Sequence, residues 1–384
     1  MKRRAAAALL LLAMVGCSSV GNLYDRWFGS QPAAKPSPLP PVQNTAAARI
    51  VWQANVGPAE RAVFFPAVTG NMVYAASAAG RIVGFDARTG KQVATIAVGQ
   101  PLSGGVGANG AMVLVGTGKG EVFAFDAGGK QLWKAQLSGE ILAPPAIEGT
   151  LVAVRTGDGR IYGFDVADGK RRWVYQRTTP ALSLRTYSGL VLDRGAIFAG
   201  FAGGRLVALT AATGTVGWDS VVALPRGTTE LERVADVSGL PAVDGDRVCA
   251  VAYQGRVACF DAQSGSTIWA RDMSSYAGLD ADHRSVYVTD DKNAVVALDK
   301  TTGASLWKQE KLAGRGVSAP LAFGRFVIVA DFQGYVHVLS REDGAFVTRV
   351  PTDGSAIGAP PVALDLSSFV VQTRNGGVFA IAVE

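Results

Sequence analysis

The segment Gly80-Arg81-Ile82-Val83-Gly84-Phe85-Asp86 is the first of eight related segments, and the last is Gly376-Gly377-Val378-Phe379-Ala380-Ile381-Ala382. The eight segments open at Gly80, Gly120, Gly159, Gly204, Gly255, Asn293, Gly334 and Gly376. They recur every 38 to 51 residues, which is the usual length of a four-stranded propeller blade. In every repeat, short apolar runs alternate with Gly, Asn and Asp, as strands and tight turns require. We predict an all-β, eight-bladed β-propeller.

Each repeat predicts a hairpin turn followed by a strand that is apolar on both faces. The opening Gly or Asn stands where a hairpin turn needs a positive φ. Four residues later comes a mostly small residue followed by a large apolar one, as in Gly84-Phe85. Adjacent residues of a strand face opposite sides of its sheet. A sheet buried on both sides must lie between two others, as stacked blades do.

A turn and a tryptophan complete the repeat. The turn has the form Asp-x-x-x-Gly, as in Asp299-Lys300-Thr301-Thr302-Gly303, where the Asp accepts backbone N–H groups and the Gly adopts the left-handed conformation. Four residues after this Gly, five repeats carry a Trp: Trp133, Trp173, Trp218, Trp269 and Trp307. Over residues 50–384, this pattern resembles the tryptophan-docking repeat of the PQQ-like, quinoprotein-type propellers.

Trp52 stands in the same strand context but precedes the first repeat. The eighth repeat stops at Glu384, before it reaches a Trp of its own. We therefore expect the N-terminal strand around Trp52 to join the C-terminal blade. This pairing closes the ring and removes the open edges of an incomplete array.

The N-terminus has the features of a secretion signal that ends in a lipid-attachment site. Basic residues at positions 2–4 precede an unbroken apolar segment, Ala5 to Val15, which is too short to span a membrane. By resemblance to bacterial lipoproteins, Cys17 becomes the acylated first residue of the mature chain, and Ser18 directs it to the outer membrane. The alternative is an ordinary signal peptide with an incidental Cys.

We expect three parts: a lipoprotein signal peptide at 1–16, a lipidated, Pro-rich tether at 17–48 and the propeller at 49–384. Five Pro residues between positions 30 and 48 favour an extended spacer. Removal of Lys2, Arg3 and Arg4 with the signal lowers the net charge from +6 to +3. No basic run with interleaved aromatics occurs, so we expect no nucleic-acid partner.

Cys249 and Cys259 lie symmetrically about Gln254, the centre of an expected hairpin. They are expected to face each other on neighbouring strands. An oxidising periplasm permits a disulfide there, but directly paired strand positions do not always meet its geometry. A disulfide and two buried free thiols are both consistent with the sequence, and the role is structural in either case.

We predict no catalytic, cofactor-binding or metal-binding site. Quinoprotein enzymes with this repeat carry a vicinal Cys pair, a catalytic Asp and a calcium site on a longer chain, and here no two Cys are adjacent. The Gly-rich stretch 116–120 is not followed by a helix, as a phosphate-binding loop requires. We expect His337 to be a packed strand residue. His283 lies in an Asp-rich turn of a kind that recurs in every blade, and a metal site is the alternative interpretation.

The two longest repeats place extra residues around Gln176–Ser188 and Val221–Gly239, and extra loop length is a common location of function. With these segments the chain resembles the BamB family, the lipoprotein propellers of the outer-membrane β-barrel assembly (BAM) machinery. In that family a Leu-x-Leu-Arg segment and an acidic segment contact the periplasmic POTRA domains of BamA. The resemblance assigns this partner-binding role to Leu182, Leu184, Arg185 and Asp236. Ser238 departs from the family pattern, which has a second Asp there.

The chemistry of these residues suits an interface. Leu182 and Leu184 match a shallow apolar pocket, and Arg185 matches charge-assisted hydrogen bonds to an acceptor on the partner. Two alternatives remain. Asp236 pairs with Arg185 within the propeller, or both segments simply connect blades.

The expected function is that of a non-enzymatic scaffold, lipid-anchored on the periplasmic face of the outer membrane. The resemblance implies that it binds the BamA POTRA domains and other BAM members and assists the folding and insertion of outer-membrane proteins. Unfolded outer-membrane proteins are a further candidate partner, bound by β-augmentation at blade edges. The alternatives are a periplasmic PQQ-dependent quinoprotein enzyme and a glycan-binding envelope propeller.

Overall fold

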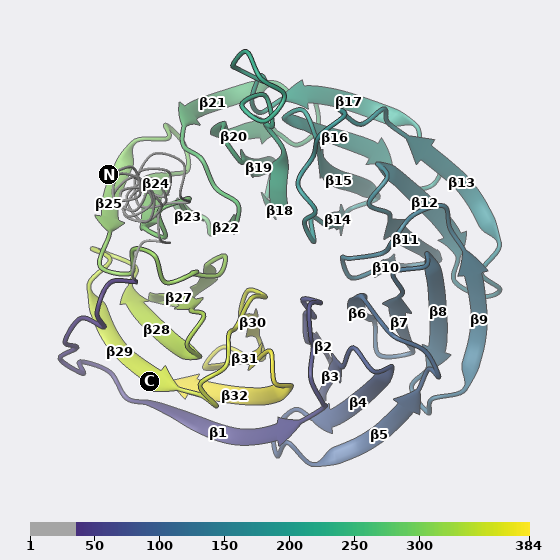
Figure 1. Cartoon of the computed structure of the whole chain (residues 1–384), viewed down its shortest axis with the longest axis horizontal. Coiled ribbons are helices and arrows are strands. Elements are labelled where there is room, and N and C mark those ends of the chain that lie inside the picture. The colour runs from purple at the N-terminus through teal and green to yellow at the C-terminus, as the bar shows by residue number, and fades with distance from the viewer. Residues whose placement is uncertain (1–35) are drawn as a thin grey trace, which may run out of the picture. The chain divides into compact units, whose positions relative to one another are not determined.

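The computed structural model describes residues 36–384, and within this range the chain forms strands and turns and no helix. The described part therefore contains no helix with the length and apolar character that a membrane crossing requires. The strands build eight four-stranded sheets, which Figure 1 shows as blades arranged in a ring. The first strand of a blade lies near the centre of the ring and the last lies at the rim (Figure 1). The predicted eight-bladed propeller is confirmed.

We number the blades from the first one in the chain. Blade 1 contains β2 (Ala67–Thr69), β3 (Met72–Ala76), β4 (Arg81–Asp86) and β5 (Gln92–Ala97). Blade 2 contains β6 (Gly104–Ala108), β7 (Met112–Gly116), β8 (Glu121–Asp126) and β9 (Gln131–Gln136). Blade 3 contains β10 (Ala146–Glu148), β11 (Leu151–Arg155), β12 (Arg160–Asp165) and β13 (Arg171–Gln176). Blade 4 contains β14 (Leu190–Asp193), β15 (Ala196–Phe201), β16 (Arg205–Thr210) and β17 (Val216–Val221).

The second half of the ring follows the same order. Blade 5 contains β18 (Val237–Asp244), β19 (Arg247–Ala252), β20 (Arg256–Asp261) and β21 (Thr267–Asp272). Blade 6 contains β22 (Gly278–Ala281), β23 (Ser285–Thr289), β24 (Val295–Asp299) and β25 (Ser305–Gln309). Blade 7 contains β26 (Leu321–Phe323), β27 (Phe326–Ala330), β28 (Tyr335–Ser340) and β29 (Phe346–Pro351). Blade 8 contains β30 (Val362–Ala363), β31 (Ser368–Gln372), β32 (Gly377–Val383) and, at the rim, β1 (Ala48–Asn55).

The ring closes in blade 8, as the sequence predicted. The N-terminal strand β1 pairs antiparallel with β32, and Trp52 stands opposite Ala380. Figure 1 shows β1 running along the outside of β32. The two ends of the propeller therefore share one sheet, and the rim strand that the C-terminal segment lacks comes from the other end of the chain.

The turn that opens each repeat has the expected positive φ in seven blades, at Gly80, Gly120, Gly159, Gly204, Asn293, Gly334 and Gly376. Blade 5 differs from the prediction, because Gln254, with φ 48°, takes the left-handed conformation one residue before Gly255. Each third strand buries four consecutive residues, or all seven in β32. The expectation of apolar strands buried on both faces is therefore confirmed.

A Trp joins six of the eight blades to the next one. The indole N–H of Trp269, in blade 5, donates to the carbonyl of Lys300 in blade 6 at 2.8 Å. A Cβ at Gly303, in that same turn, would stand only 2.6 Å from the indole, so the turn needs a glycine there. The same bond links the pairs Trp52–Ala87, Trp133–Val166, Trp173–Ala211, Trp218–Ala262 and Trp307–Arg341. The pattern Asp-x-x-x-Gly-x-x-x-Trp is thus a docking device between blades.

The small residue of the third strand faces the Trp of its own blade. Gly163 pairs with Trp173, and a Cβ at Gly163 would lie 2.2 Å from the indole. In blade 7 the Trp position is occupied by Thr348, which pairs with Val338. A larger residue is accommodated there because no indole covers it.

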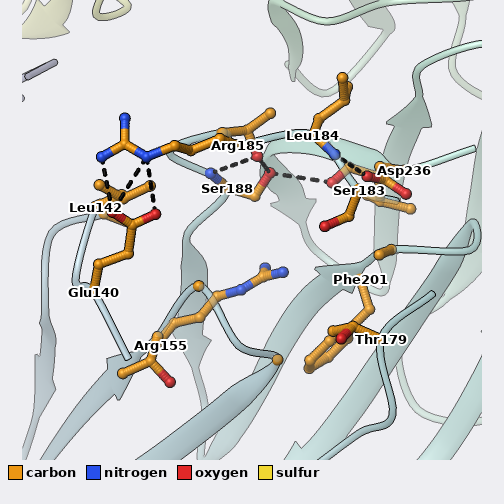
Figure 2. Close-up of a pocket in the computed structure, with 17 residues that line it drawn as sticks. Glu140, Leu142, Arg155, Thr179, Ser183, Leu184, Arg185, Ser188, Phe201 and Asp236 are labelled. Carbon is orange, nitrogen blue, oxygen red and sulfur yellow. Dashed lines mark hydrogen bonds and ion pairs between the residues drawn. The ribbon is translucent and has the colours of Figure 1, made fainter. Parts of the chain in front are cut away.

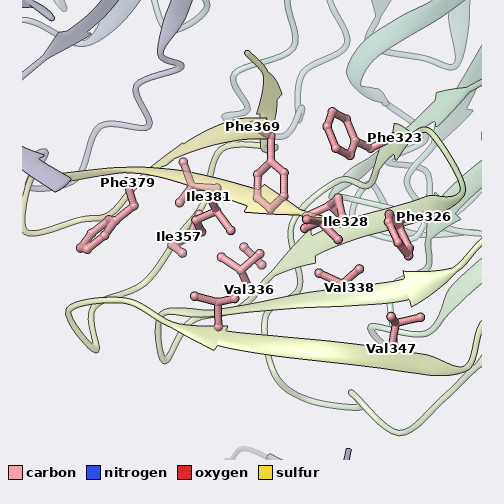
Figure 3. Close-up of a cluster of buried hydrophobic side chains, with 14 residues drawn as sticks. Phe323, Phe326, Ile328, Val336, Val338, Val347, Ile357, Phe369, Phe379 and Ile381 are labelled. Atoms are coloured by element: carbon pink, nitrogen blue, oxygen red, sulfur yellow. The ribbon is translucent and has the colours of Figure 1, made fainter. Parts of the chain in front are cut away.

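The interface between blades 7 and 8 lacks a docked Trp and is filled by a large apolar cluster instead (Figure 3). Phe323 of β26 meets Phe369 of β31 edge to face, with ring centroids 5.6 Å apart. Phe379 and Ile381 of β32 add to the same cluster. Aromatic and aliphatic burial therefore holds blade 7 against blade 8.

Cys249 in β19 pairs directly with Cys259 in β20, and the two form a disulfide. Both residues are buried. Of the two alternatives that the sequence left open, the structure contains the disulfide, and it links two strands within one blade.

Residues 37–47, here called the strap, lie against blade 7 before the chain enters β1. The Ser37 N–H donates to the Ala313 carbonyl and the Thr45 N–H to the Val347 carbonyl, each at 3.0 Å. Arg315 donates to the Ser37 carbonyl at 3.1 Å, and Arg349 donates to that of Pro40 at 2.9 Å. The sequence predicts that these residues belong to the tether. In the structure they pack on the propeller, because Arg315 in the loop between β25 and β26 and Arg349 in β29 bind their carbonyl groups.

The two arginines belong to a buried network that includes His337. Asp331 accepts a hydrogen bond from Arg315 Nε at 2.8 Å, and its Oδ2 lies 3.0 Å from His337 Nε2. Arg349 Nε donates to His337 Nδ1 at 3.2 Å, which requires this nitrogen to be unprotonated. Burial lowers the pKa of His337, although the Asp331 charge acts in the opposite direction. The prediction of a packed strand histidine is confirmed.

Candidate functional site

Two loops hold the residues that the resemblance assigned to partner binding. The first loop, residues 177–189, connects β13 of blade 3 to β14 of blade 4, and the second loop, residues 222–236, connects β17 to β18 of blade 5. Both run from the rim of one blade to the centre of the next. Because antiparallel strands alternate in direction, both loops lie on the same face of the ring.

Asp236, at the end of the second loop, fixes the first loop. Its carboxylate accepts a hydrogen bond from the Leu184 N–H at 2.6 Å and one from the Gly203 N–H at 3.2 Å. The Asp236 side chain is buried, so its contribution is to position Leu184 and its neighbours. The structure therefore brings all four assigned residues into one region, with Asp236 beneath the surface.

Arg185 does not pair with Asp236, so that alternative is wrong. Its Nε and Nη2 groups form a bidentate pair with the Glu140 carboxylate at 2.8 to 3.2 Å. Figure 2 shows Arg185 turned toward Glu140 and away from Asp236. The reason is that Asp236 is already occupied by backbone N–H groups, whereas Glu140 is presented by the loop between blades 2 and 3. The hydrogen bonds to Glu140 raise the pKa of Arg185.

The end of the first loop is anchored toward the middle of the ring. Tyr187 packs edge to face on Phe65, with centroids 5.5 Å apart, and its hydroxyl donates to the Gly358 carbonyl at 3.1 Å. Ser188 donates to the Val237 carbonyl at 3.1 Å. Burial raises the pKa of Tyr187 to about 12, so its hydroxyl keeps the proton that it donates. The residues before this anchor are therefore held at the surface.

Leu182 and Leu184 differ in exposure. The Leu182 residue is 47% exposed, whereas Leu184 is half-buried against the pocket that the loop covers. The second loop adds Leu224 and Leu231, which are 65% and 70% exposed. These two leucines were not singled out from the sequence. Large apolar residues in a loop that departs from the repeat are the sequence signal that could have identified them.

Ser238 lies below this surface. It is buried in β18, and its hydroxyl donates to the Ser275 carbonyl at 2.7 Å. At this position the chain therefore offers the surface no carboxylate and no exposed hydroxyl.

The loops cover a cavity of about 200 Å³ between blades 3 and 4. Figure 2 shows Glu140, Arg155, Ser183, Phe201 and Asp236 around it. Arg155, the last residue of β11, was not predicted as a site residue. Arg155 follows four buried apolar residues of the strand, and this sequence pattern does not indicate that its guanidinium lies in a cavity.

The Asp-rich turn around His283 is accounted for by local hydrogen bonds. Asp282 accepts the N–H groups of Arg284 and Ser285 and a bond from the Tyr287 hydroxyl. His283 itself is exposed. Across residues 36–384, no three His, Cys, Asp or Glu side chains are grouped as a metal site would require.

Comparison with known proteins gives one consistent result. The family model described as outer membrane protein assembly factor BamB matches residues 78–309 and 294–384. A protein of that name from Nitrosomonas eutropha is 42% identical, and the match covers 98% of this chain and 93% of the relative. The chain belongs to the BamB family. The crystal structure of BamB from Moraxella catarrhalis has a TM-score of 0.81 and 28% identity, with 88% of this chain and all of that chain covered.

Quinoprotein dehydrogenases share the architecture of the BamB family and not its sequence. A europium-containing methanol dehydrogenase matches with a TM-score of 0.69 and 12% identity, over 87% of this chain and 93% of that chain. Such a likeness shows the propeller fold alone. The propeller fold alone therefore does not separate these two groups of proteins, and the two loops are the place to look for what does.

Proposed function

We propose that the chain is a non-catalytic scaffold of the outer-membrane β-barrel assembly machinery and that its first and second loops bind the POTRA domains of BamA. Membership of a family described as outer membrane protein assembly factors supports the role. One structural observation supports the site: a buried carboxylate, Asp236, fixes a surface loop that carries Leu182 and Arg185. A loop held in one conformation binds a partner without a large ordering cost.

The contacts available on this loop suit a folded partner domain. Leu182 is free to enter an apolar pocket on the partner, a burial that contributes about 1.5 to 3 kcal/mol. Arg185 uses Nε and Nη2 for Glu140, which leaves its Nη1 group available to an acceptor on the partner. Glu140 thus orients the guanidinium in advance, and a partner carbonyl or carboxylate completes its hydrogen bonds.

The proposal includes a lipid anchor at the periplasmic face of the outer membrane. Signal residues 1–16, the acylated Cys17 and most of the tether lie outside the described residues. The strap begins at Ser37, on the loop between β25 and β26, so Ser37 lies on the same face of the propeller as the two loops. The 20 residue steps from Cys17 to Ser37 span at most about 70 Å when extended. This span lets the loops meet a partner close to the membrane.

The decisive experiment is capture of the purified periplasmic region of BamA by the full-length chain in detergent. We compare the wild type with the double variant Leu182→Ala, Arg185→Ala, which changes two exposed side chains and should keep the wild-type thermal melting. The matched control is Leu366→Ala, Arg88→Ala, in turns between β30 and β31 and between β4 and β5. Loss of capture only in the loop variant supports the proposed site. Equal capture by all three moves the interface elsewhere on the propeller, and no capture by the wild type contradicts the function.

A second function, direct binding of unfolded outer-membrane proteins, is favoured by the strap. The strap covers the edge of β29 with one backbone hydrogen bond, and Val347 beneath it is buried. The corresponding aliphatic residues Val93, Leu132 and Leu306 on other rim strands are 44 to 61% exposed. An extended client segment can pair with these edges as the strap does with β29. Proline substitutions in β5, β9 and β25 that left client binding unchanged would exclude this function.

The enzyme and glycan alternatives have their own assays. Dye reduction after addition of pyrroloquinoline quinone and calcium would identify a quinoprotein enzyme. Sedimentation of the chain with purified sacculi would identify a glycan-binding propeller. We expect a negative result in both assays, because the exposed side chains of the two loops suit contact with the surface of another protein.

A further inference from the structure

Arg155 places a second positive charge at the site, inside the cavity that the first loop covers. It is the last residue of β11 and is half-buried. Its guanidinium lies over the Phe201 ring, 4.8 Å from the centroid. One of its N–H groups donates to the Gly189 carbonyl at 3.3 Å. Figure 2 shows the side chain extending into the space between Glu140, Ser188 and Phe201.

The carboxylates around Arg155 are engaged with other groups. Glu140 binds Arg185, Asp158 binds Arg160, and Asp236 accepts two backbone N–H groups. Within residues 36–384, no carboxylate oxygen forms an ion pair with Arg155. Burial lowers the pKa of Arg155 to about 10, an effect that the nearby Asp236 charge only partly offsets. The guanidinium is therefore charged at neutral pH and lacks a direct counterion. A partly buried charge of this kind destabilises the fold unless a negatively charged group binds it.

The cavity offers further hydrogen-bond donors beside Arg155. Thr179 and Ser183 line it and are exposed residues of the first loop. Their hydroxyl groups form no hydrogen bond with any described residue, unlike those of Thr186 and Ser188, which are joined to each other. A planar guanidinium with two free hydroxyls nearby matches the acceptor oxygens of a carboxylate.

We propose that this cavity receives the carboxylate of an Asp or Glu side chain from the partner domain that docks on the first loop. Arg155 donates two N–H groups to the carboxylate oxygens, and Thr179 and Ser183 donate their hydroxyls. This inference rests on the proposed scaffold function and adds to it the chemistry of one partner residue. The partner thus presents an acidic side chain beside the apolar contact that Leu182 makes.

The test measures the dissociation constant between the full-length chain in detergent and the purified BamA periplasmic region. Arg155→Met keeps the packing against Phe201 and removes the charge, and Arg155→Lys keeps the charge but not the two-pronged geometry. Arg172→Met is the control, because Arg172 is an exposed, ion-paired residue on the rim strand of the same blade. We expect Arg155→Met to weaken binding at least about 10-fold, Arg155→Lys to weaken it less, and Arg172→Met to leave it unchanged.

The outcomes separate this inference from the function on which it rests. Wild-type binding that Arg155→Met leaves unchanged, but that Leu182→Ala, Arg185→Ala abolishes, overturns the carboxylate pocket and keeps the scaffold. Absence of wild-type binding overturns both. If Arg155→Met lowers the melting temperature, the Arg155→Lys variant provides the test. A dissociation constant for Arg155→Lys equal to that of the wild type would reject the bidentate contact.

The acidic residue itself is identified from the partner side. Each Asp and Glu of the BamA region is changed in turn to Asn or Gln. The proposal requires one change that weakens binding to the wild type and has no further effect on Arg155→Met, as a double-mutant cycle demands. A scan that finds no such residue rejects the assignment.

Discussion

At the scale of single residues, the carboxylate of Asp236 controls the shape of the first loop. Asp236→Asn keeps one oxygen acceptor and replaces the other with an amide NH2 group that faces a backbone N–H group. We expect a loss of about 1 to 3 kcal/mol in the free energy of unfolding, since a buried donor is left unpaired. We also expect weaker capture of the BamA region, although neither Leu182 nor Arg185 has changed. Urea unfolding and capture measure the two effects.

The control for Asp236→Asn is Asp246→Asn, whose side chain is 86% exposed. It should change neither property. If Asp236→Asn were as stable as the wild type and bound equally well, the carboxylate would not be what holds the loop.

His337 gives the propeller a pH-dependent stability. Burial lowers its pKa in the folded state, whereas in the unfolded chain it is about 6.5. Below about pH 7 the unfolded state therefore binds the proton that the folded state rejects, and the free energy of unfolding falls as pH decreases. One such group contributes a slope of at most about 1.4 kcal/mol per pH unit. The ionisable groups that face His337 are Asp331, Arg315 and Arg349.

His337→Gln should remove this slope. The measurement is urea unfolding of both proteins from pH 8 to pH 5. At pH 8 the difference between them reports packing alone, and the difference should shrink or reverse as the pH falls. Parallel curves over the whole range would show that His337 does not contribute to the acid sensitivity.

At the scale of blades, the contact between a Trp and the next turn is the unit of assembly. Gly303→Ala introduces a Cβ 2.6 Å from Trp269, at φ +72°. Gly324→Ala is the matched control, since its φ is +56° but no atom lies within 4 Å of the added Cβ. Both variants are destabilised by about 1 kcal/mol, because alanine is unfavourable in the left-handed backbone conformation. We expect Gly303→Ala to lose at least about 1 kcal/mol more, because the indole must move.

Thermal and urea unfolding of both alanine variants measure that difference. Equal losses would mean that the Trp accommodates the methyl group and that docking does not depend on the glycine. The indole N–H bond to Lys300 would then be the more important part of the contact.

At the scale of the whole molecule, β1 closes the ring of blades by pairing with β32 in blade 8. A chain that begins at Val56 lacks β1 and Trp52, which leaves the edge of β32 uncovered and one interface without its indole. We expect a lower melting temperature and concentration-dependent association, because an exposed strand edge pairs with other chains. The comparison is a chain that begins at Ser37, which keeps the strap and β1. Calorimetry and light scattering test this, and identical behaviour of the two chains would contradict the role of ring closure.

Local spacing explains why so much of the fold was predictable. The apolar strand, the Asp-x-x-x-Gly turn and the Trp recur at similar distances in the sequence, and six of the eight blades make the same Trp contact with the next blade. Eight copies therefore predict eight blades. Trp52, placed before the first copy, predicts that the N-terminus completes the last blade.

The sequence by itself determined the propeller, its closure and the two loops that depart from the repeat. Only the tertiary structure decided that Arg185 pairs with Glu140, that Tyr187 reaches Gly358, that Cys249 and Cys259 are bonded, and that the strap lies on blade 7. The physical reason is that a repeat specifies contacts made by every blade alike. Arg185 and Glu140, 45 residues apart, and Tyr187 and Gly358, 171 residues apart, meet once each, in places that no spacing in the chain encodes.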